Sequence, residues 1–267
     1  MKRRTVKGQV VVVLAASIVG ALLMVASGLA FSVEGNSSGT KSEDCGDGKV
    51  ATGGGYASDD ETRWEPLASQ PSGHRWMVSL RNESGSTQKA TVSAVCANGS
   101  RYSIKSKKVV VSAAAFEGVT QAVNVKCPSG TTLAGGGFGP TTGADHASVL
   151  DSAPKDDRTW RTRTYGYRVT AGSITFKARA VCDRTSADYA IRSLSFAENP
   201  PRALRGTEVA FSEKAECKAS ERVTSGGFAT DDVNVYYRHM HDAGNGWKLS
   251  GGTYSSTPIT VYALCLK

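Results

Sequence analysis

The sequence predicts an all-β protein built from three related, disulfide-closed antiparallel modules. The first observation is a threefold repeat, since each copy contains a cysteine, a glycine cluster ending in an aromatic residue, a tryptophan and a second cysteine. The second is that apolar and polar residues alternate before each closing cysteine, as in a strand with one buried face. The third is that no long segment keeps the apolar spacing of a helix. Together they predict sandwich-like modules, or modules packed around a pseudo-threefold axis as a β-prism.

The N-terminal part of the chain has the pattern of an export signal. A basic segment at residues 1–7 precedes an uncharged apolar stretch at residues 10–31. Because this stretch is also long enough to span a bilayer, residues 1–30 are predicted to be a signal peptide, cleaved after Ala30, or a membrane anchor. Contact with a membrane is expected only through residues 10–31, if they are not removed. The polar residues 31–44 are predicted to be a tether, and the rest of the chain to be secreted or on the extracellular face of the membrane.

The six cysteines of an exported chain are expected to form disulfides. Among the possible pairings, the repeat favours the one in which each module closes on itself: Cys45 with Cys96, Cys127 with Cys182, and Cys217 with Cys265. Each bond would close a loop of about fifty residues and remove unfolded-state entropy worth at most roughly 4 kcal/mol. Zinc is not expected, because metal-binding cysteines come in close pairs and these cysteines are far apart.

The repeat places the three modules at residues 45–100, 101–186 and 187–267. In each module one strand carries the tryptophan and a later strand carries the closing cysteine. A hairpin between these strands is expected, with residues 82–86 as its turn in the first module. The glycine clusters are expected to mark a bulge or a close backbone approach to the tryptophan, because no phosphate-loop pattern and no helix pattern follows them.

The second module carries the most complete form of the motif: Cys127-Pro128-Ser129-Gly130, Gly135 to Phe138, Ser152-Ala153-Pro154, Trp160 and Ala180-Val181-Cys182. This arrangement resembles a module found in exported actinobacterial proteins of uncharacterised role. The resemblance covers most of residues 45–267, although the third module has Lys218 and Ser220 at the proline and glycine positions and lacks the S-x-P element. It implies export, and it brings no known activity, cofactor or site.

The charge and the candidate site residues are less informative than the repeat. The formal net charge of +8 includes the N-terminal basic segment, and the other cations are spread along the chain, so nucleic-acid binding is not expected. The candidate contact residues are the tyrosines Tyr165, Tyr167, Tyr236 and Tyr237. His239 and His241 have strand-like spacing that puts both imidazoles on one side, which suits copper or zinc. The alternative is a solvated loop that replaces the S-x-P turn. No cofactor is expected.

These observations predict an exported, non-enzymatic β-repeat protein of the cell envelope or extracellular space, with a binding or structural role. A cell-wall polymer, a glycan or a protein would be its partner, because repeated modules with variable loops suit several weak sites that act together. The alternative is a secreted hydrolase with its site in the divergent third module, so whether the protein is an enzyme stays open. The sequence does not predict the ligand or the oligomeric state.

Overall fold

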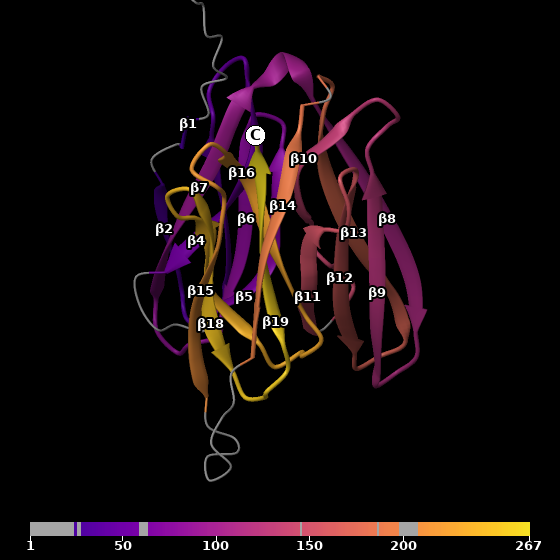
Figure 1. Cartoon of the computed structure of the whole chain (residues 1–267). Helices are drawn as coiled ribbons and strands as arrows, with labels where there is room; N and C mark the ends of the chain where they lie inside the picture. The colour runs from indigo at the N-terminus through magenta and orange to yellow at the C-terminus, as the bar shows by residue number, and fades with distance from the viewer. Residues whose placement is uncertain (1–23, 26–27, 59–63, 145, 186, 198–207) are drawn as a thin grey trace, which may run out of the picture.

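The computed structural model describes residues 24–25, 28–58, 64–144, 146–185, 187–197 and 208–267. These residues form antiparallel strands and one short 3-10 turn at Gly99–Arg101 (Figure 1), so the all-β prediction is confirmed. The strands are β1 (Met24–Val25), β2 (Leu29–Val33), β3 (Ser38–Asp44), β4 (Lys49–Ser58), β5 (Trp64–Ser72), β6 (Arg75–Asn82), β7 (Gln88–Asn98), β8 (Tyr102–Ala113), β9 (Glu117–Lys126), β10 (Thr132–Phe138), β11 (His146–Pro154), β12 (Thr159–Arg168), β13 (Gly172–Asp183), β14 (Tyr189–Phe196), β15 (Val209–Glu216), β16 (Arg222–Thr230), β17 (Tyr236–Asp242), β18 (Gly246–Thr253) and β19 (Ile259–Leu266).

Each module consists of six strands in the same order, β2 to β7 in the first, β8 to β13 in the second and β14 to β19 in the third. The six strands form two three-stranded sheets that enclose a core. In the second module β8, β13 and β10 pair in one sheet, and β9, β12 and β11 pair in the other. The equivalent strands pair in the same way in the first and third modules. Each module is therefore a small sandwich.

The expected hairpin between the tryptophan strand and the cysteine strand is wrong. In the first module β6 carries Trp76 and pairs with β3 and β5, whereas β7 carries Cys96 and pairs with β2 and β4. Residues 83–87 therefore cross from one sheet of the sandwich to the other. Alternation determines only which side chains of a strand are buried, and two strands can bury their apolar faces against each other across a sandwich as well as within one sheet.

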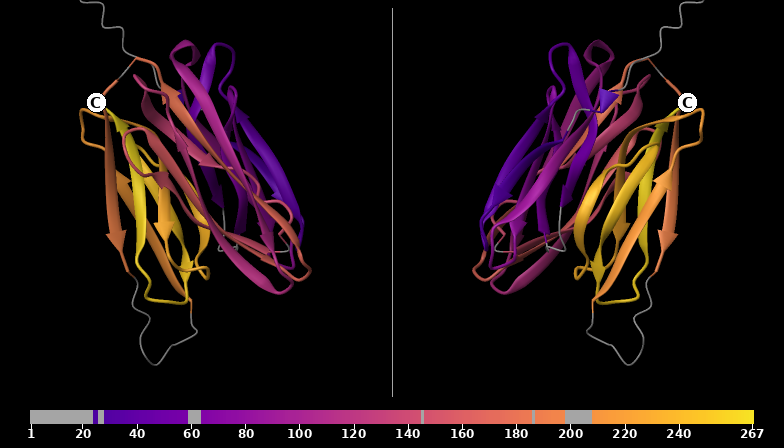
Figure 2. Two further views of the ribbon diagram at one scale, coloured as in Figure 1. Left: turned by 90° about the vertical axis from the view of Figure 1, so that its right-hand side faces the viewer. Right: turned by 90° about the vertical axis from the view of Figure 1, so that its left-hand side faces the viewer.

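Each module shares its sheets with the other two modules, so the three modules close a ring. Three equivalent pairs that join modules are Phe138 with Ser69, Phe228 with Ser152, and Tyr56 with Met240. In each pair, the aromatic residue that ends a glycine cluster lies opposite a strand of a neighbouring module. This strand is β5, β11 or β17, the one directly before the tryptophan strand. These equivalent pairings define a pseudo-threefold axis. Figure 2 shows the strands of all three modules extending lengthwise, with some tilt, between the end with the C-terminus and the opposite end.

Residues 31–44 are not a tether, contrary to the prediction. Phe31 lies in β2, which pairs with β7, and the polar segment Ser38–Asp44 forms β3, which pairs with β6. Val33 is buried, and the Asn82 amide donates to its carbonyl oxygen over 3.0 Å. Backbone hydrogen bonds to a neighbouring strand can hold such an edge strand without apolar side chains. The first module thus has the same two edge strands as the other modules.

The predicted signal peptide or anchor at residues 1–30 lies mostly outside the described residues. Its described part contributes β1 and the first two residues of β2, Leu29 and Ala30, both of which pair with β7. Cleavage after Ala30 would remove these residues and leave three residues of β2 in place. In the described part of the chain, no helix is both long and apolar enough to cross a membrane.

The glycine clusters form a bulge and lie against the tryptophans, as the sequence predicts. A register shift interrupts each glycine strand, between Ala51 and Gly53, Leu133 and Gly135, and Val223 and Ser225. A Cβ atom would overlap with an indole ring at each of three glycines, at Gly54 with Trp76, at Gly136 with Trp160 and at Gly226 with Trp247. Because these tryptophans are buried in the cores of their modules, glycine is required for the two strands to approach.

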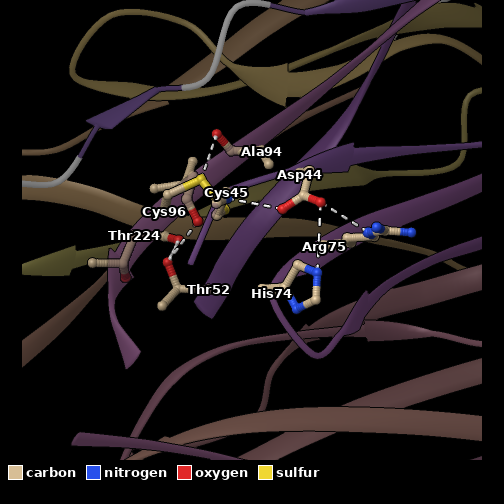
Figure 3. Close-up of a disulfide and its surroundings, with 10 residues drawn as sticks. Asp44, Cys45, Thr52, His74, Arg75, Ala94, Cys96 and Thr224 are labelled. Atoms are coloured by element: carbon tan, nitrogen blue, oxygen red, sulfur yellow. Dashed lines mark hydrogen bonds and ion pairs between the residues drawn. A yellow bond between two sulfur atoms is a disulfide. The ribbon is translucent and has the colours of Figure 1, made fainter. Parts of the chain in front are cut away.

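The disulfides are Cys45–Cys96, Cys127–Cys182 and Cys217–Cys265, which is the pairing that the repeat favours. Cys45 follows β3 and Cys96 lies in β7, so the bond links the two sheets of the first module. Figure 3 shows this bond close to Thr52. The Thr52 hydroxyl can donate to the carbonyl oxygens of Val95, at 3.1 Å, and of Thr224, at 3.0 Å, and the second contact joins the first module to the third.

A serine on the neighbouring strand accepts a hydrogen bond from the tryptophan in two of the three modules. Trp76 Nε1 donates to Ser69 Oγ, and Trp160 Nε1 donates to Ser152 Oγ, both over 3.0 Å. The third module has Met240 at the equivalent position. Trp247 Nε1 is buried there, and no residue of the described chain accepts its hydrogen. The replacement of serine by methionine therefore leaves an unsatisfied donor in the third core.

Candidate functional site

A pocket lies at the end of the pseudo-threefold axis that is opposite the disulfides. Strands β5, β11 and β17 all begin at this end, and the residues at their starts line a cavity of about 240 Å³ that is open to solvent. The three strands contribute equivalent positions, because each has a register shift just after the pocket: after Pro66, after Val149 and after Tyr237. The lining residues that carry chemistry are Trp64, Glu65, Glu83, His146, Tyr236, Tyr237 and Tyr254.

Glu65 is the most enclosed charged group of this axial pocket. Its side chain is 13% exposed, and Arg81 donates to its carboxylate over 2.8 Å. The backbone N–H of Ala147, in the second module, donates to the other carboxylate oxygen over 3.3 Å. Burial raises the pKa of the Glu65 carboxyl, while Arg81 and the Ala147 amide favour its charged form. Glu65 therefore holds two modules together and presents a hydrogen-bond acceptor at the pocket.

The third module supplies an aromatic side to the axial pocket. The ring centroids of Tyr236 and Tyr254 are 6.5 Å apart, and the planes of the rings are inclined by 47°. The Arg238 guanidinium lies 5.5 Å from the Tyr236 ring centroid and pairs with Glu208 over 2.6 Å. Both tyrosines are partly exposed, so this side of the pocket offers ring surface and hydroxyl groups together.

Two buried residues in the lining carry polar atoms without partners. Trp64 of β5 pairs with Tyr237 of β17, and both side chains are buried. Neither Trp64 Nε1 nor Tyr237 Oη has a hydrogen-bond partner within the described chain. Burial also raises the pKa of the Tyr237 hydroxyl, which keeps it protonated and able to donate. Buried polar atoms without partners are rare in native proteins.

The structure separates the four tyrosines that were expected to contact a ligand. Tyr236 lines the axial pocket. Tyr237 also belongs to the lining, but it is 2% exposed and packs against Phe228 with 4.3 Å between ring centroids, so the expectation that it is an exposed aromatic is wrong. Strand alternation explains this, because adjacent residues point to opposite faces of the sheet. Tyr165 and Tyr167 are partly exposed on β12, and neither belongs to the pocket lining.

His239 and His241 lie side by side on β17, at the seam between the third and first modules. Their ring centroids are 6.0 Å apart, and His241 Nδ1 lies 2.5 Å from the backbone oxygen of Asp242. Among the described residues, the one cluster with three possible metal ligands is Cys217, Glu221 and Cys265, and both of its sulfurs belong to a disulfide. Binding of a metal ion by the two histidines stays a prediction.

The sequence did not point to Trp64, Glu65 or Tyr254. Trp64 and Glu65 come shortly before the S-x-P element of the first module, while the equivalent positions of the second module are Ala147 and Ser148. An alignment of the three repeats at the glycine clusters would have shown these differences. It would not have shown that the three strand starts meet at one pocket, because this depends on the closure of the ring.

Comparison of the sequence with models of known protein families finds no match, and comparison with curated protein sequences also finds none. The all-β fold, the three disulfides and the axial pocket are therefore the basis for an assignment of function.

Proposed function

We propose that this protein is an exported, non-enzymatic β-repeat protein that binds one sugar unit of a glycan in the axial pocket. The observation that carries the proposal is the meeting of an enclosed carboxylate, Glu65, with the tyrosines Tyr236 and Tyr254 in one open cavity. A carboxylate accepts hydrogen bonds from sugar hydroxyl groups, and tyrosine rings pack against the C–H surface of a sugar ring. Proteins use this combination of apolar surface and a few placed polar groups to orient a ligand.

The size of the cavity sets the size of the ligand. Pockets for drug-sized molecules usually have volumes of roughly 300–1,000 Å³, and the axial pocket has about 240 Å³. It therefore suits a single ring at the end of a chain, or one ring of a chain that continues into solvent. The unpartnered Trp64 Nε1 and Tyr237 Oη belong to buried side chains behind this surface, so the partly exposed groups Glu65, Tyr236 and Tyr254 are the ones a ligand would contact.

Export is supported by the disulfides and by the N-terminal sequence pattern. Three disulfides close the three modules, and such bonds persist in oxidising compartments outside the cytoplasm. Together with the resemblance to exported actinobacterial modules, this favours a place in the cell envelope or the extracellular space. A glycan of the cell wall is then the partner that fits both the place and the pocket.

A hydrolase centred on the third module receives less support. Ser93 Oγ donates to the Asp242 carboxylate over 3.3 Å, whereas a catalytic triad needs the serine to donate to the histidine. His241 Nδ1 contacts the Asp242 backbone oxygen instead of its carboxylate. The binding experiment below includes a test for hydrolysis, which decides between the two functions.

The test is co-sedimentation of the exported, disulfide-bonded protein with insoluble cell wall and a panel of insoluble polysaccharides. It is followed by calorimetry with soluble fragments of any polymer that binds. Tyr236→Ala and Glu65→Gln are each expected to weaken binding about tenfold, by loss of ring contact and of an ionised acceptor. Tyr165→Ala is the matched control, because Tyr165 is also partly exposed and lies outside the pocket.

Two results would overturn this proposal. Equal affinities for the wild type and both pocket variants would move the binding site elsewhere, as would a loss of affinity confined to Tyr165→Ala. Release of new reducing ends from a bound polysaccharide, lost with His239→Ala or His241→Ala, would make the protein a hydrolase.

A further inference from the structure

Three cations gather on the outer face of the sheet that the first and second modules share. Lys108 of β8 lies directly opposite Lys177 of β13. Arg179 follows two residues along β13 and lies opposite Gly137 of β10. The side chains of Ala178 and Ala180 are buried. Lys177 and Arg179 alternate with them along β13, so they point to the opposite, outer face of the sheet. Directly opposite side chains in a sheet have Cβ atoms about 5 Å apart, and diagonal neighbours have Cβ atoms about 7–8 Å apart, so the three cations start from neighbouring positions on one face.

No carboxylate neutralises this group, which we call the cation triad, in the described part of the chain. The ion pairs found there do not include Lys108, Lys177 or Arg179. Arg179 donates to the backbone oxygen of Pro71 over 2.5 Å, and its Nε is buried without a partner. Burial lowers the pKa of the Arg179 guanidinium, and no acidic neighbour opposes this effect.

Three other partly buried arginines of the described chain have acidic partners, whereas Arg158, like Arg179, donates to a backbone oxygen, that of Cys127. Arg101 pairs with Asp183, Arg192 pairs with Glu221, and Arg238 pairs with Glu208. These pairs follow the general rule that a buried charge is compensated by an opposite charge. Arg179 departs from the rule, and two lysines beside it add to the uncompensated charge.

The fold itself does not require cations at these positions. The register places Ala30, Thr91 and Ser93 at the equivalent positions of the first module, and Ser195, Thr260 and Tyr262 at those of the third module. Both sister modules build the same strands with neutral residues. Like charges directly opposite each other destabilise a sheet, so Lys108 and Lys177 weaken the second module. Arg179 bonds to Pro71 of the first module, but neutral residues replace it in both sister modules.

We propose that the cation triad binds a polyanionic chain, a polymer that carries carboxylate or phosphate groups along its length. Lysine ammonium groups and an arginine guanidinium are the groups that proteins use for such anions. A bound anion removes the repulsion between Lys108 and Lys177 and brings a negative charge close to the uncompensated Arg179 guanidinium. The site lies on the outer face of the shared sheet, apart from the axial pocket, and the proposal does not depend on the function proposed for that pocket.

The test replaces the cation triad by residues of the sister modules, as Lys108→Ser, Lys177→Thr and Arg179→Ser. The matched control removes the same charge from three exposed lysines elsewhere, as Lys126→Ser, Lys155→Ser and Lys218→Ser. Binding is measured by calorimetry with polygalacturonate for carboxylate and with polyphosphate for phosphate. The titrations run from about 50 to about 200 mM NaCl, because charge-driven binding weakens with salt.

The proposal expects the triad variant to lose affinity for at least one of these polymers by about tenfold or more, and to show a flatter dependence on salt. The control variant keeps the affinity of the wild type. The two polymers then distinguish a carboxylate site from a phosphate site. Equal losses of affinity in both variants would show that binding depends on net charge and not on the cation triad, and would overturn the proposal. So would the absence of wild-type binding to both polymers. Single-stranded DNA is included as a comparison. If it binds more tightly than both polymers, the ligand is a nucleic acid and the proposal is overturned.

A stability measurement keeps the test informative if the affinity is low. Relief of like-charge repulsion is expected to raise the Tm of Lys108→Ser, which keeps the Arg179 bond to Pro71, in the absence of polyanion. Addition of the polymer raises the Tm of the wild type and of the control, because ligands that bind only the folded state stabilise it. A triad variant that is stabilised by the polymer as strongly as the wild type would contradict the proposed site.

Discussion

Replacing Ser152 by alanine removes the acceptor of a fully buried hydrogen bond and leaves the rest of the second core in place. Ser152 Oγ accepts from Trp160 Nε1 over 3.0 Å, and the two residues are 3% and 1% exposed. Water cannot replace the lost acceptor at such low exposure, so the indole N–H should remain unsatisfied. The expected cost is about 1–3 kcal/mol of unfolding free energy. For a chain of this size that corresponds to a Tm lower by about 3–10 °C.

The assay is equilibrium urea unfolding of the disulfide-bonded protein, with Ser193→Ala as the control because Ser193 is exposed. A ¹⁵N–¹H correlation spectrum gives an independent readout, since the indole N–H signal of Trp160 should shift toward the position expected for an unbonded indole, as for Trp247. A change in unfolding free energy below about 0.5 kcal/mol, the range of ordinary surface substitutions, would refute the reasoning. So would a spectrum in which the Trp160 signal does not move.

Two further predictions concern the glycine strand and pH. Gly136→Ala should lower the unfolding free energy by about 1–3 kcal/mol or more, because its Cβ would overlap with the Trp160 indole. Gly85→Ala, where a Cβ meets no atom within 4 Å, should leave urea unfolding unchanged, and similar effects of both would contradict the packing argument. Hydrogen bonding to Arg192 lowers the pKa of Glu221 to about 2 from 4.5. Its stabilising contribution is therefore present above pH 4.5 and lost as the pH falls toward about 2. Acid unfolding curves should show this loss in the wild type and not in Glu221→Gln.

Local features of the sequence determined the strands, the buried faces and the close contacts within each module. Alternation before Cys96, Cys182 and Cys265 indicates which side chains of a strand are buried, because strand geometry has a period of two. The glycine clusters could be assigned to a close approach because a residue without a Cβ has few other uses in a strand. The disulfide pairing followed from the repeat, since three equivalent modules are expected to close in the same way.

The tertiary structure decided which strands pair and which distant residues meet. Alternation in β7 is the same whether this strand pairs with β6 or with β4, so the sequence could not exclude the wrong hairpin. It also could not show that residues 31–44 join the first module. Backbone hydrogen bonds carry the pairing, and they do not depend on the type of side chain. The axial pocket and the cation triad both arise where segments from separate strands converge. Their composition is written in the sequence, but only closure of the ring and the register between strands place these side chains together.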